Sequence, residues 1–285
     1  MELAASENEA KISKFDEGQI WVKTCHNATR RLLALLLSRK NEKKLHIITA
    51  EIDLSSGDAL DYGPRFVEPF PRDKMREYVV RERPWDGLDI FAQNIDDTPE
   101  LRRFRRWANA YQMIKAVNYS LENFFGDDAP NDILEEDNEL GSAYAPQWQW
   151  RLVGCTSAKD RSQPHINAFI ADSQPHRAGR LNSGEVSLAY GLIAKRRIED
   201  GYNDHRYIPI TIVSASDFQV RILQMWHDKH NPKALQVRSS PIMDFKDGLE
   251  SNLDNWVTIL CWVAGKPVGD TKNGTEVVPV IEHDA

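Results

Sequence analysis

The stretch QIWVKTCHNATRRLLALLLSRKNEKKLHIITAEIDL, residues 19–54, decides the expected fold. Residues 19–24 form a short, apolar-rich segment, which is typical of a strand. From Asn27 onward the leucines are too dense for a surface helix, so we expect a buried helix that ends near residues 41–44. Residues 45–54 have the length and β-branched composition of a second strand. The order strand, buried helix, strand predicts a βαβ unit, and therefore an α/β fold with parallel neighbouring strands.

The rest of the chain continues the alternation of helices and strands. Residues 97–100, Asp-Thr-Pro-Glu, combine a capping residue, a proline and an early acid, so they predict the start of a helix that runs to about Phe125. Residues 126–146 are acidic and poor in large apolar side chains, which favours an exposed loop. Further helices are expected at residues 72–83, 184–198 and 252–263, and strands at residues 88–93, 148–155, 165–172, 207–214, 219–227 and 234–239.

The composition is that of an ordinary globular protein. Of the 285 residues, 41% are hydrophobic and 28% are charged, which argues against wholesale disorder. The N-terminal residues do not resemble a secretory signal, and the longest apolar run, residues 32–37, is too short to span a bilayer. The three cysteines are widely spaced, which favours reduced thiols and a cytoplasmic location. We expect one α/β domain over residues 1–285, with an acidic loop plus inserted hairpin at 126–182 and flexible tails at 1–14 and 270–285.

Charge is unevenly distributed along the chain. The net charge of −7 argues against a general nucleic-acid coat protein, but binding follows local patches. Two segments are strongly basic and are candidates for contacts with RNA phosphates. An alternative interpretation is a solvated helix face balanced by Asp73, Glu77 and Glu82. The basic residues are Arg72, Lys74, Arg76, Arg81, Arg83, Arg102, Arg103, Arg105 and Arg106.

The expected turn from strand to helix at Thr24 to Asn27 is the first candidate for catalysis. Side chains at the carboxyl edge of a parallel sheet are where α/β proteins place their sites. The hydroxyl of Thr24 or the thiol of Cys25 would face the positive N-terminus of the helix there, so either side chain could act as a nucleophile. The alternative is that Thr24 and Asn27 only cap the helix.

Several common site motifs are absent from the sequence. It contains no GxGxxG, no GxxxxGK[ST], no HExxH and no GxSxG, which argues against the usual nucleotide and zinc sites. The histidines of residues 227–230 favour a polar turn over a metal site. Asp228 followed by Gln236 and Arg238 resembles a decayed metal-dependent nuclease pattern, but Gln and Arg cannot hold Mg²⁺. We therefore expect no metal and no cofactor.

In their order along the chain, these elements resemble the cyclodipeptide synthases. The first strand of that family ends in a Ser-x-x-Asn turn, and the segment Thr24 to Asn27 stands in that place, with threonine instead of serine. A helix rich in Arg and Lys follows in the family, as residues 72–83 do here. Residues 96–107, DDTPELRRFRRW, resemble the next segment. The resemblance covers most of residues 17–125.

Later parts of the resemblance are thinner. Tyr190 corresponds to a helical tyrosine of the family, and Trp226 with His227 corresponds to an aromatic residue and a histidine at a strand end. The family has a glutamate four residues after its tyrosine, where this chain has Ala194.

The resemblance implies a Rossmann-like parallel sheet similar to the catalytic domain of class I aminoacyl-tRNA synthetases, with an additional β-rich region. It implies a cytoplasmic, tRNA-dependent aminoacyltransferase of secondary metabolism that makes a diketopiperazine and needs no cofactor. Aminoacyl-tRNAs would be the partners, without DNA or membrane. Similarity to a fungal branch that makes arginine-containing products points to arginyl-tRNA.

The same resemblance implies roles for individual residues. Thr24 would accept the first aminoacyl group in a ping-pong route, and Asn27 would orient the substrate. Tyr190 would bind the substrate amine or relay protons, and His227 belongs to the same expected catalytic set. Substrate contacts are expected from Glu51, Asp53 and Trp226, since a carboxylate can pair with an arginyl guanidinium.

Two other functions are compatible with the sequence. The first is an acyltransferase that uses the same sheet edge without tRNA. The second is a non-catalytic RNA-binding or interaction protein, whose binding would depend on the basic segments and would weaken steeply with salt.

Overall fold

The computed structural model describes residues 17–30, 36–55, 63–83, 98–126, 131–133, 142–145 and 148–273. Within these residues a nine-stranded sheet has the strand order β1-β9-β8-β7-β6-β5-β3, with β10 paired to β8 and β4 paired to β5. Its strands are β1 (Ile47–Glu51), β3 (Asn131–Ile133), β4 (Ser142–Ala145), β5 (Trp148–Ala158), β6 (Ile166–Asp172), β7 (Tyr207–Ser216), β8 (Gln219–Asp228), β9 (Asn231–Ser239) and β10 (Met243–Asp244). A separate two-stranded sheet pairs β2 (Val67–Glu68) with β11 (Lys266–Pro267).

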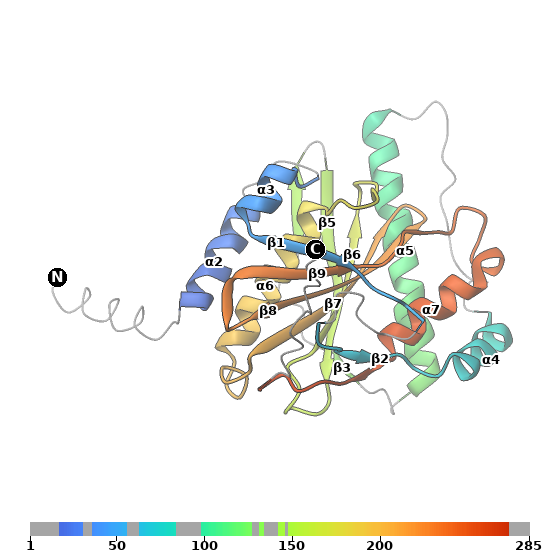
Figure 1. Ribbon diagram of the computed structural model, residues 1–285. Helices are drawn as coiled ribbons and strands as arrows, with labels where there is room; N and C mark the ends of the chain where they lie inside the picture. Colours follow the sequence, from blue (N-terminus) through green and yellow to red (C-terminus); the bar gives the residue numbers. More distant parts are fainter. Residues whose placement is uncertain are drawn as a thin grey trace, which may run out of the picture.

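Helices cover both faces of the main sheet (Figure 1). The helices are α2 (Glu17–Arg30), α3 (Arg39–Lys44), α4 (Arg72–Glu82), α5 (Pro99–Phe125), α6 (Ser183–Ile198) and α7 (Leu253–Val263), with a 3-10 turn, η2 (Glu250–Asn252). One core lies between the sheet and α2 with α6, and a second lies between the opposite face and α5 with α7. Residues of β7 and β8 are buried on both faces, as expected for central strands.

The α/β class is confirmed, but the sheet is mixed and not parallel. Parallel pairs are β6 with β7 and β1 with β9, and every other described pair of neighbouring strands is antiparallel. The βαβ unit is therefore formed by β6, α6 and β7. This places the N-terminus of α6 at the sheet edge where the two parallel strands end.

The strand predicted at residues 19–24 is wrong, because this segment belongs to α2. Its buried side chains, Val22, Cys25 and Thr29, are three and four residues apart, which is the spacing of one helix face. The helix predicted from residue 27 to residues 41–44 is not continuous, and its residues 31–35 lie outside the described residues. Residues 37 and 38 are not helical, because the Leu37 amide donates to the Leu181 carbonyl at 3.0 Å and Ser38 then caps α3.

Residues 126–146 contain two strands that the composition did not predict. Strands β3 and β4 both pair with β5. The predicted hairpin at residues 148–172 exists as β5 and β6, but it lies within the main sheet and is not an insertion. The predicted strand at residues 88–93 and the terminal segments 1–14 and 274–285 lie outside the described residues.

Other elements follow the sequence closely. Helix α5 begins where predicted, with Pro99 in its first turn and the Thr98 hydroxyl accepting from the amide of Leu101. Helices α4, α6 and α7 and strands β7 to β9 are confirmed within a few residues. Among the described helices, none combines the length and the apolar character needed to cross a bilayer.

Candidate nucleic-acid interface

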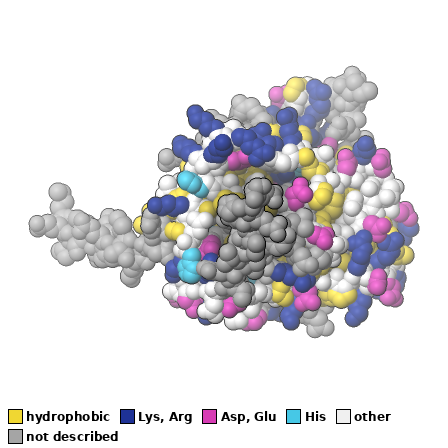
Figure 2. Space-filling model, viewed as in Figure 1, with side chains coloured by type: hydrophobic (Ala, Val, Ile, Leu, Met, Phe, Trp, Pro, Cys, Tyr) yellow, Lys and Arg dark blue, Asp and Glu magenta, His cyan; other side chains and the backbone are white. Residues whose placement is uncertain are grey.

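A band of basic side chains follows one edge of the molecule, where β6 and β7 end. It is built by α3, by residues 173–182 and by the first two turns of α5. Figure 2 shows Lys and Arg side chains gathered along the top, over α3 and towards the N-terminal end of α5. We call this band the basic rim. Its ten residues are Arg39, Lys40, Lys43, Lys44, Arg102, Arg103, Arg105, Arg106, Arg177 and Arg180.

The basic rim opposes the charge of the rest of the chain. Residues 39–44, 99–106 and 173–182 carry these ten cations and two acidic residues, Glu42 and Glu100, whereas the whole chain has a net charge of −7. Glu42 is buried, and its carboxylate pairs with the Arg39 guanidinium at 2.9 Å. The exposed charge of the rim is therefore strongly positive.

Direct contacts hold the three segments of the rim together. Arg39 donates to the Gly179 carbonyl at 2.9 Å, and Arg180 donates to the Leu37 carbonyl, so the loop is fixed to the start of α3. Gly179 has a φ of 64°, which glycine adopts without steric cost. At the other end of the loop, Arg106 donates from Nε to the Ser173 carbonyl at 2.9 Å.

A buried ion pair beneath the rim anchors the loop. Glu185, in the first turn of α6, accepts from Arg221 of β8 at 2.9 and 2.5 Å, and both side chains are almost fully buried. Arg221 also donates to the Arg180 carbonyl at 2.7 Å. The second Glu185 oxygen accepts from the Asn182 amide at 2.8 Å, which caps α6. One guanidinium thus connects the sheet, α6 and the loop.

Two more buried polar side chains support the loop. The Asp172 carboxylate accepts from the amide of Gln174 at 2.8 Å and from the Asn182 side chain at 3.3 Å. His176 contacts the Ser214 carbonyl through Nε2 at 3.0 Å. Contacts at Gln174 and His176 hold the loop before Arg177, and the contact at Asn182 holds it after Arg180. These contacts favour one conformation of the loop.

Burial sets the ionisation of these groups. Burial, reinforced by the charge of Glu185, raises the pKa of Asp172 to about 7. Burial and then the Arg221 charge lower the pKa of His176 to about 4, so this ring is neutral at pH 7. Burial would raise the pKa of Glu185, but the Arg221 charge outweighs it and lowers that pKa. The network therefore contains one firmly ionised pair.

The N-terminal part of α5 combines arginine with aromatic rings. The Phe104 side chain is 54% exposed, and its ring centroid is 6.2 Å from that of Trp107. Trp107 in turn stacks on Tyr111, with 5.5 Å between centroids and 22° between planes. Neither Arg102 nor Arg103 forms an ion pair within the described part of the chain. An exposed aromatic ring among arginine side chains is a feature of single-stranded nucleic-acid sites.

The other predicted basic segment, on α4, is already neutralised within the protein. Arg72 and Arg76 both pair with the carboxylate of Asp254 on α7, and Arg83 pairs with Glu250 at 3.2 Å. Arg81 pairs with its neighbour Glu82 at 2.7 Å. Only Lys74 forms no ion pair with a described residue. The two basic segments that the sequence predicted therefore differ: the arginines of α4 form ion pairs within the protein, whereas Arg102 and Arg103 form none with described residues.

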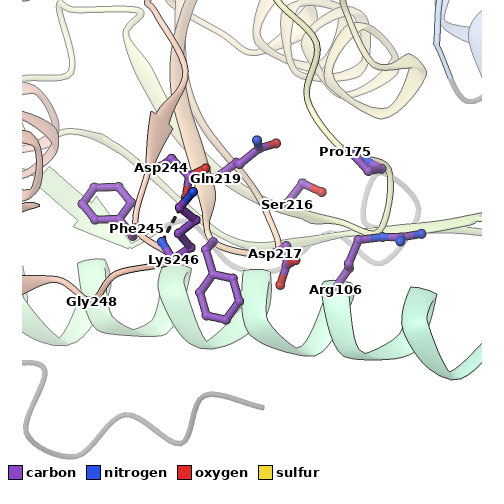
Figure 3. A pocket seen from close by; sticks show the side chains of 10 residues that line it. Arg106, Pro175, Ser216, Asp217, Gln219, Asp244, Phe245, Lys246 and Gly248 are labelled. Atoms are coloured by element: carbon purple, nitrogen blue, oxygen red, sulfur yellow. Dashed lines mark hydrogen bonds between the residues drawn. The ribbon is translucent and has the colours of Figure 1, made fainter. Parts of the chain in front are cut away.

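A pocket of about 720 Å³ opens next to the rim (Figure 3). It lies between the start of α5, Pro175 and the turn from β7 to β8. Figure 3 shows Lys246 on one side, Arg106 with Pro175 on the other, and Ser216 and Asp217 between them. Its lining residues are Arg106, Pro175, Ser216, Asp217, Phe218, Gln219, Asp244, Phe245, Lys246 and Gly248.

The residues predicted to be catalytic fall into two groups. Thr24 and Asn27 are exposed in the middle of α2, and the Thr24 hydroxyl donates to the Ile20 carbonyl at 2.8 Å. The strand-to-helix turn on which the role of Thr24 depended is therefore not formed. Tyr190 and His227 are buried, and both rings lie against Trp21 of α2.

Hydrogen bonds already engage these two buried rings. The Tyr190 hydroxyl donates to the Leu45 carbonyl at 3.1 Å, and burial raises its pKa well above the ordinary value. His227 contacts the Pro232 carbonyl through Nε2 at 3.0 Å and Arg197 through Nδ1 at 3.3 Å. Such contacts are typical of structural side chains.

The predicted substrate contacts have different surroundings. Glu51 is exposed at the end of β1, an edge strand. The Asp53 carboxylate accepts from the amide and the hydroxyl of Ser55, at 2.9 and 2.7 Å, in a local turn. Trp226 lies under the Arg238 guanidinium, 4.3 Å from its ring centroid.

Sequence reasoning missed six residues of the rim, namely those of α3 and of the loop. The run RKNEKK at residues 39–44 carried a signal, because four of its six residues are basic. Arg177 and Arg180 are isolated in sequence and become part of the rim only through the contacts with residues 37–42.

Comparison with known proteins identifies no family for this chain, because no family model, no curated protein and no solved structure matches it. Among the described residues, no three His, Cys, Asp or Glu side chains are grouped closely enough to hold a metal ion.

Proposed function

We propose that this protein binds single-stranded RNA through the basic rim. The observation that carries the proposal is a set of ten Lys and Arg residues on three segments that contact one another, on a chain whose net charge is −7. Phosphate contacts supply most of the affinity of such surfaces. The exposed ring of Phe104, between Arg103 and Arg105, offers a base a stacking partner, which favours an unpaired strand.

RNA binding is also common to two of the three functions that the sequence suggested. A tRNA-dependent cyclodipeptide synthase and a non-catalytic RNA-binding protein would both need a surface for phosphates. The synthase activity stays a prediction, and the geometry supports it less well, because Thr24 is exposed in the middle of α2 whereas Tyr190 and His227 are buried. Mass spectrometry of extracts from a host that expresses the chain, in search of new cyclic dipeptides, would test it.

The binding test uses a fluorescein-labelled single-stranded RNA of about 20 nucleotides and fluorescence anisotropy over roughly 50 to 200 mM salt. Two variants each remove three positive charges. The first, R102Q/R103Q/R105Q, changes the rim. The second, K159Q/K229Q/K233Q, changes exposed lysines at the opposite end of the sheet, at the turns after β5 and β8 and on β9.

The rim variant should lose about tenfold or more in affinity, and its salt dependence should fall by about two in slope, because each phosphate contact contributes about 0.7 for a single strand. The control variant should bind within about twofold of the unchanged protein. Equal losses in both variants would mean that only net charge matters, and an unaffected rim variant would place binding elsewhere.

A further inference from the structure

The pocket beside the rim has features that a phosphate-binding surface alone does not explain. Arg106 belongs both to the rim and to the pocket wall, so the two are continuous. The Ser216 hydroxyl lines the pocket, is fully buried, and has no hydrogen-bond partner among the described residues. A buried polar group without a partner is costly, so a hydroxyl in that state on a pocket wall points to a ligand.

The backbone at the pocket is fixed by contacts with α5. Asp217 has a φ of 54°, one of three described non-glycine residues with a positive φ. Contacts to α5 hold it there, because its amide donates to the Arg106 carbonyl at 3.1 Å and its carboxylate accepts from Asn109 at 2.8 Å. A positive φ is the ordinary geometry of a two-residue hairpin turn, and these contacts hold the turn between β7 and β8 in one place at the pocket wall.

The lining offers a partner for each chemical part of a nucleotide. The cations of Arg106 and Lys246 suit phosphate oxygens. The Asp217 carboxylate and the Ser216 hydroxyl are of the types that bind ribose hydroxyls. Phe218 offers its ring to a base. The pocket volume of about 720 Å³ lies within the range of small-molecule sites.

We infer that this pocket receives one unpaired ribonucleotide of the RNA bound along the basic rim, an inference that rests on the proposed function. The strand would follow the rim as far as Arg106 and place one base and its ribose in the pocket. Ser216 and Asp217 would then contact the 2′-hydroxyl, which distinguishes RNA from DNA. The rim would supply affinity, and the pocket would supply the preference for RNA.

The first test compares single-stranded RNA with single-stranded DNA of the same sequence by fluorescence anisotropy. The unchanged protein should prefer RNA by about fivefold. The variant S216A/D217N should bind both strands with the DNA affinity of the unchanged protein, because the rim is intact. Asn tolerates the left-handed backbone of residue 217, so folding should be preserved, and thermal unfolding checks this. The control D160N removes the same charge from an exposed turn after β5 and should keep the preference.

The outcomes separate this inference from the proposed function. Equal binding of RNA and DNA by the unchanged protein would overturn the ribonucleotide site in the pocket, and so would a preference for RNA that survives in S216A/D217N. Either result would leave the proposed RNA binding along the basic rim intact. Failure to bind either strand would overturn both.

A second test does not depend on a variant. Single-stranded RNA with 4-thiouridine, crosslinked by ultraviolet light, should attach to the tryptic peptide of residues 207–221, which contains Ser216, Asp217 and Phe218. Crosslinks confined to the rim peptides would place the base outside the pocket and overturn the inference.

Discussion

Helix α4 and the start of α5 carry similar densities of arginine, but the surrounding structure treats them differently. On α4, Arg72 and Arg76 share the carboxylate of Asp254 on α7. On α5, Arg102 and Arg103 form no ion pair with described residues. The first set joins two helices of the protein, whereas the second is available to a partner. The difference depends on an acid about 180 positions further along the chain, so no local pattern reports it.

The largest effect should follow from removing the support beneath the rim. The substitution E185A leaves the buried Arg221 guanidinium without its carboxylate, which should cost about 3–5 kcal/mol in the free energy of unfolding measured with urea. Residues 173–182 should also exchange amide hydrogen faster, because Arg221 holds the Arg180 carbonyl. The contact between α4 and α7 does not involve this pair.

The double variant E185A/R221M provides the control. Removing both charges should restore much of the lost stability, since the unpaired buried charge causes most of the cost. Equal increases in hydrogen exchange in α4 and in residues 173–182 would show that the rim has no separate support.

The two regions should also differ in their response to pH. Asp172, beneath the rim, has a pKa raised to about 7, whereas its unfolded value is about 4. As the pH rises, the unfolded chain loses the Asp172 proton near pH 4, whereas the folded protein keeps it until about pH 7. The free energy of unfolding should therefore fall between these two pH values, on the order of 1 kcal/mol per pH unit. The pKa of Asp254 is lowered by hydrogen bonds from Arg76 and Arg72, so its contribution is lost only in more acidic solution.

Thermal unfolding at several pH values between 5 and 8 measures this difference. The substitution D172N should remove the decline, and D254N should leave it unchanged. A decline of the same size in D172N would assign the titration to another group.

The sequence predicted those parts of the fold that local chemistry determines. The cap of α5 is one example, because the Thr98 hydroxyl, Pro99 and Glu100 act within one turn. The strands β7 and β8 are another, because each is a run rich in β-branched and other apolar residues, and the two are adjacent in the chain. Parallel neighbours are harder to predict, since β1 pairs with β9 from the other end of the chain.

Helix α2 shows how the prediction of the site failed. Its β-branched and aromatic residues favoured a strand, but Val22, Cys25 and Thr29 pack one face against α6. Tertiary packing decided the element, and the expected catalytic turn at Thr24 was lost with the strand. Of the rim, only the arginines of α5 were predicted, because a run of charge is visible locally and a contact between residues 37 and 180 is not.

The smallest effect should come from converting α4 into a region that resembles the rim. The substitution D254N removes the carboxylate that Arg72 and Arg76 share, and both side chains are already partly exposed. If ion pairing is what separates the two helices, the released arginines should raise the affinity for single-stranded RNA by about twofold at low salt, and the gain should vanish at high salt. The control D160N makes the same change in net charge at an exposed turn and should leave the affinity unchanged. An equal gain in D254N and D160N would attribute the effect to net charge, and no gain in D254N would mean that the position of α4, and not its pairing, keeps it from the RNA.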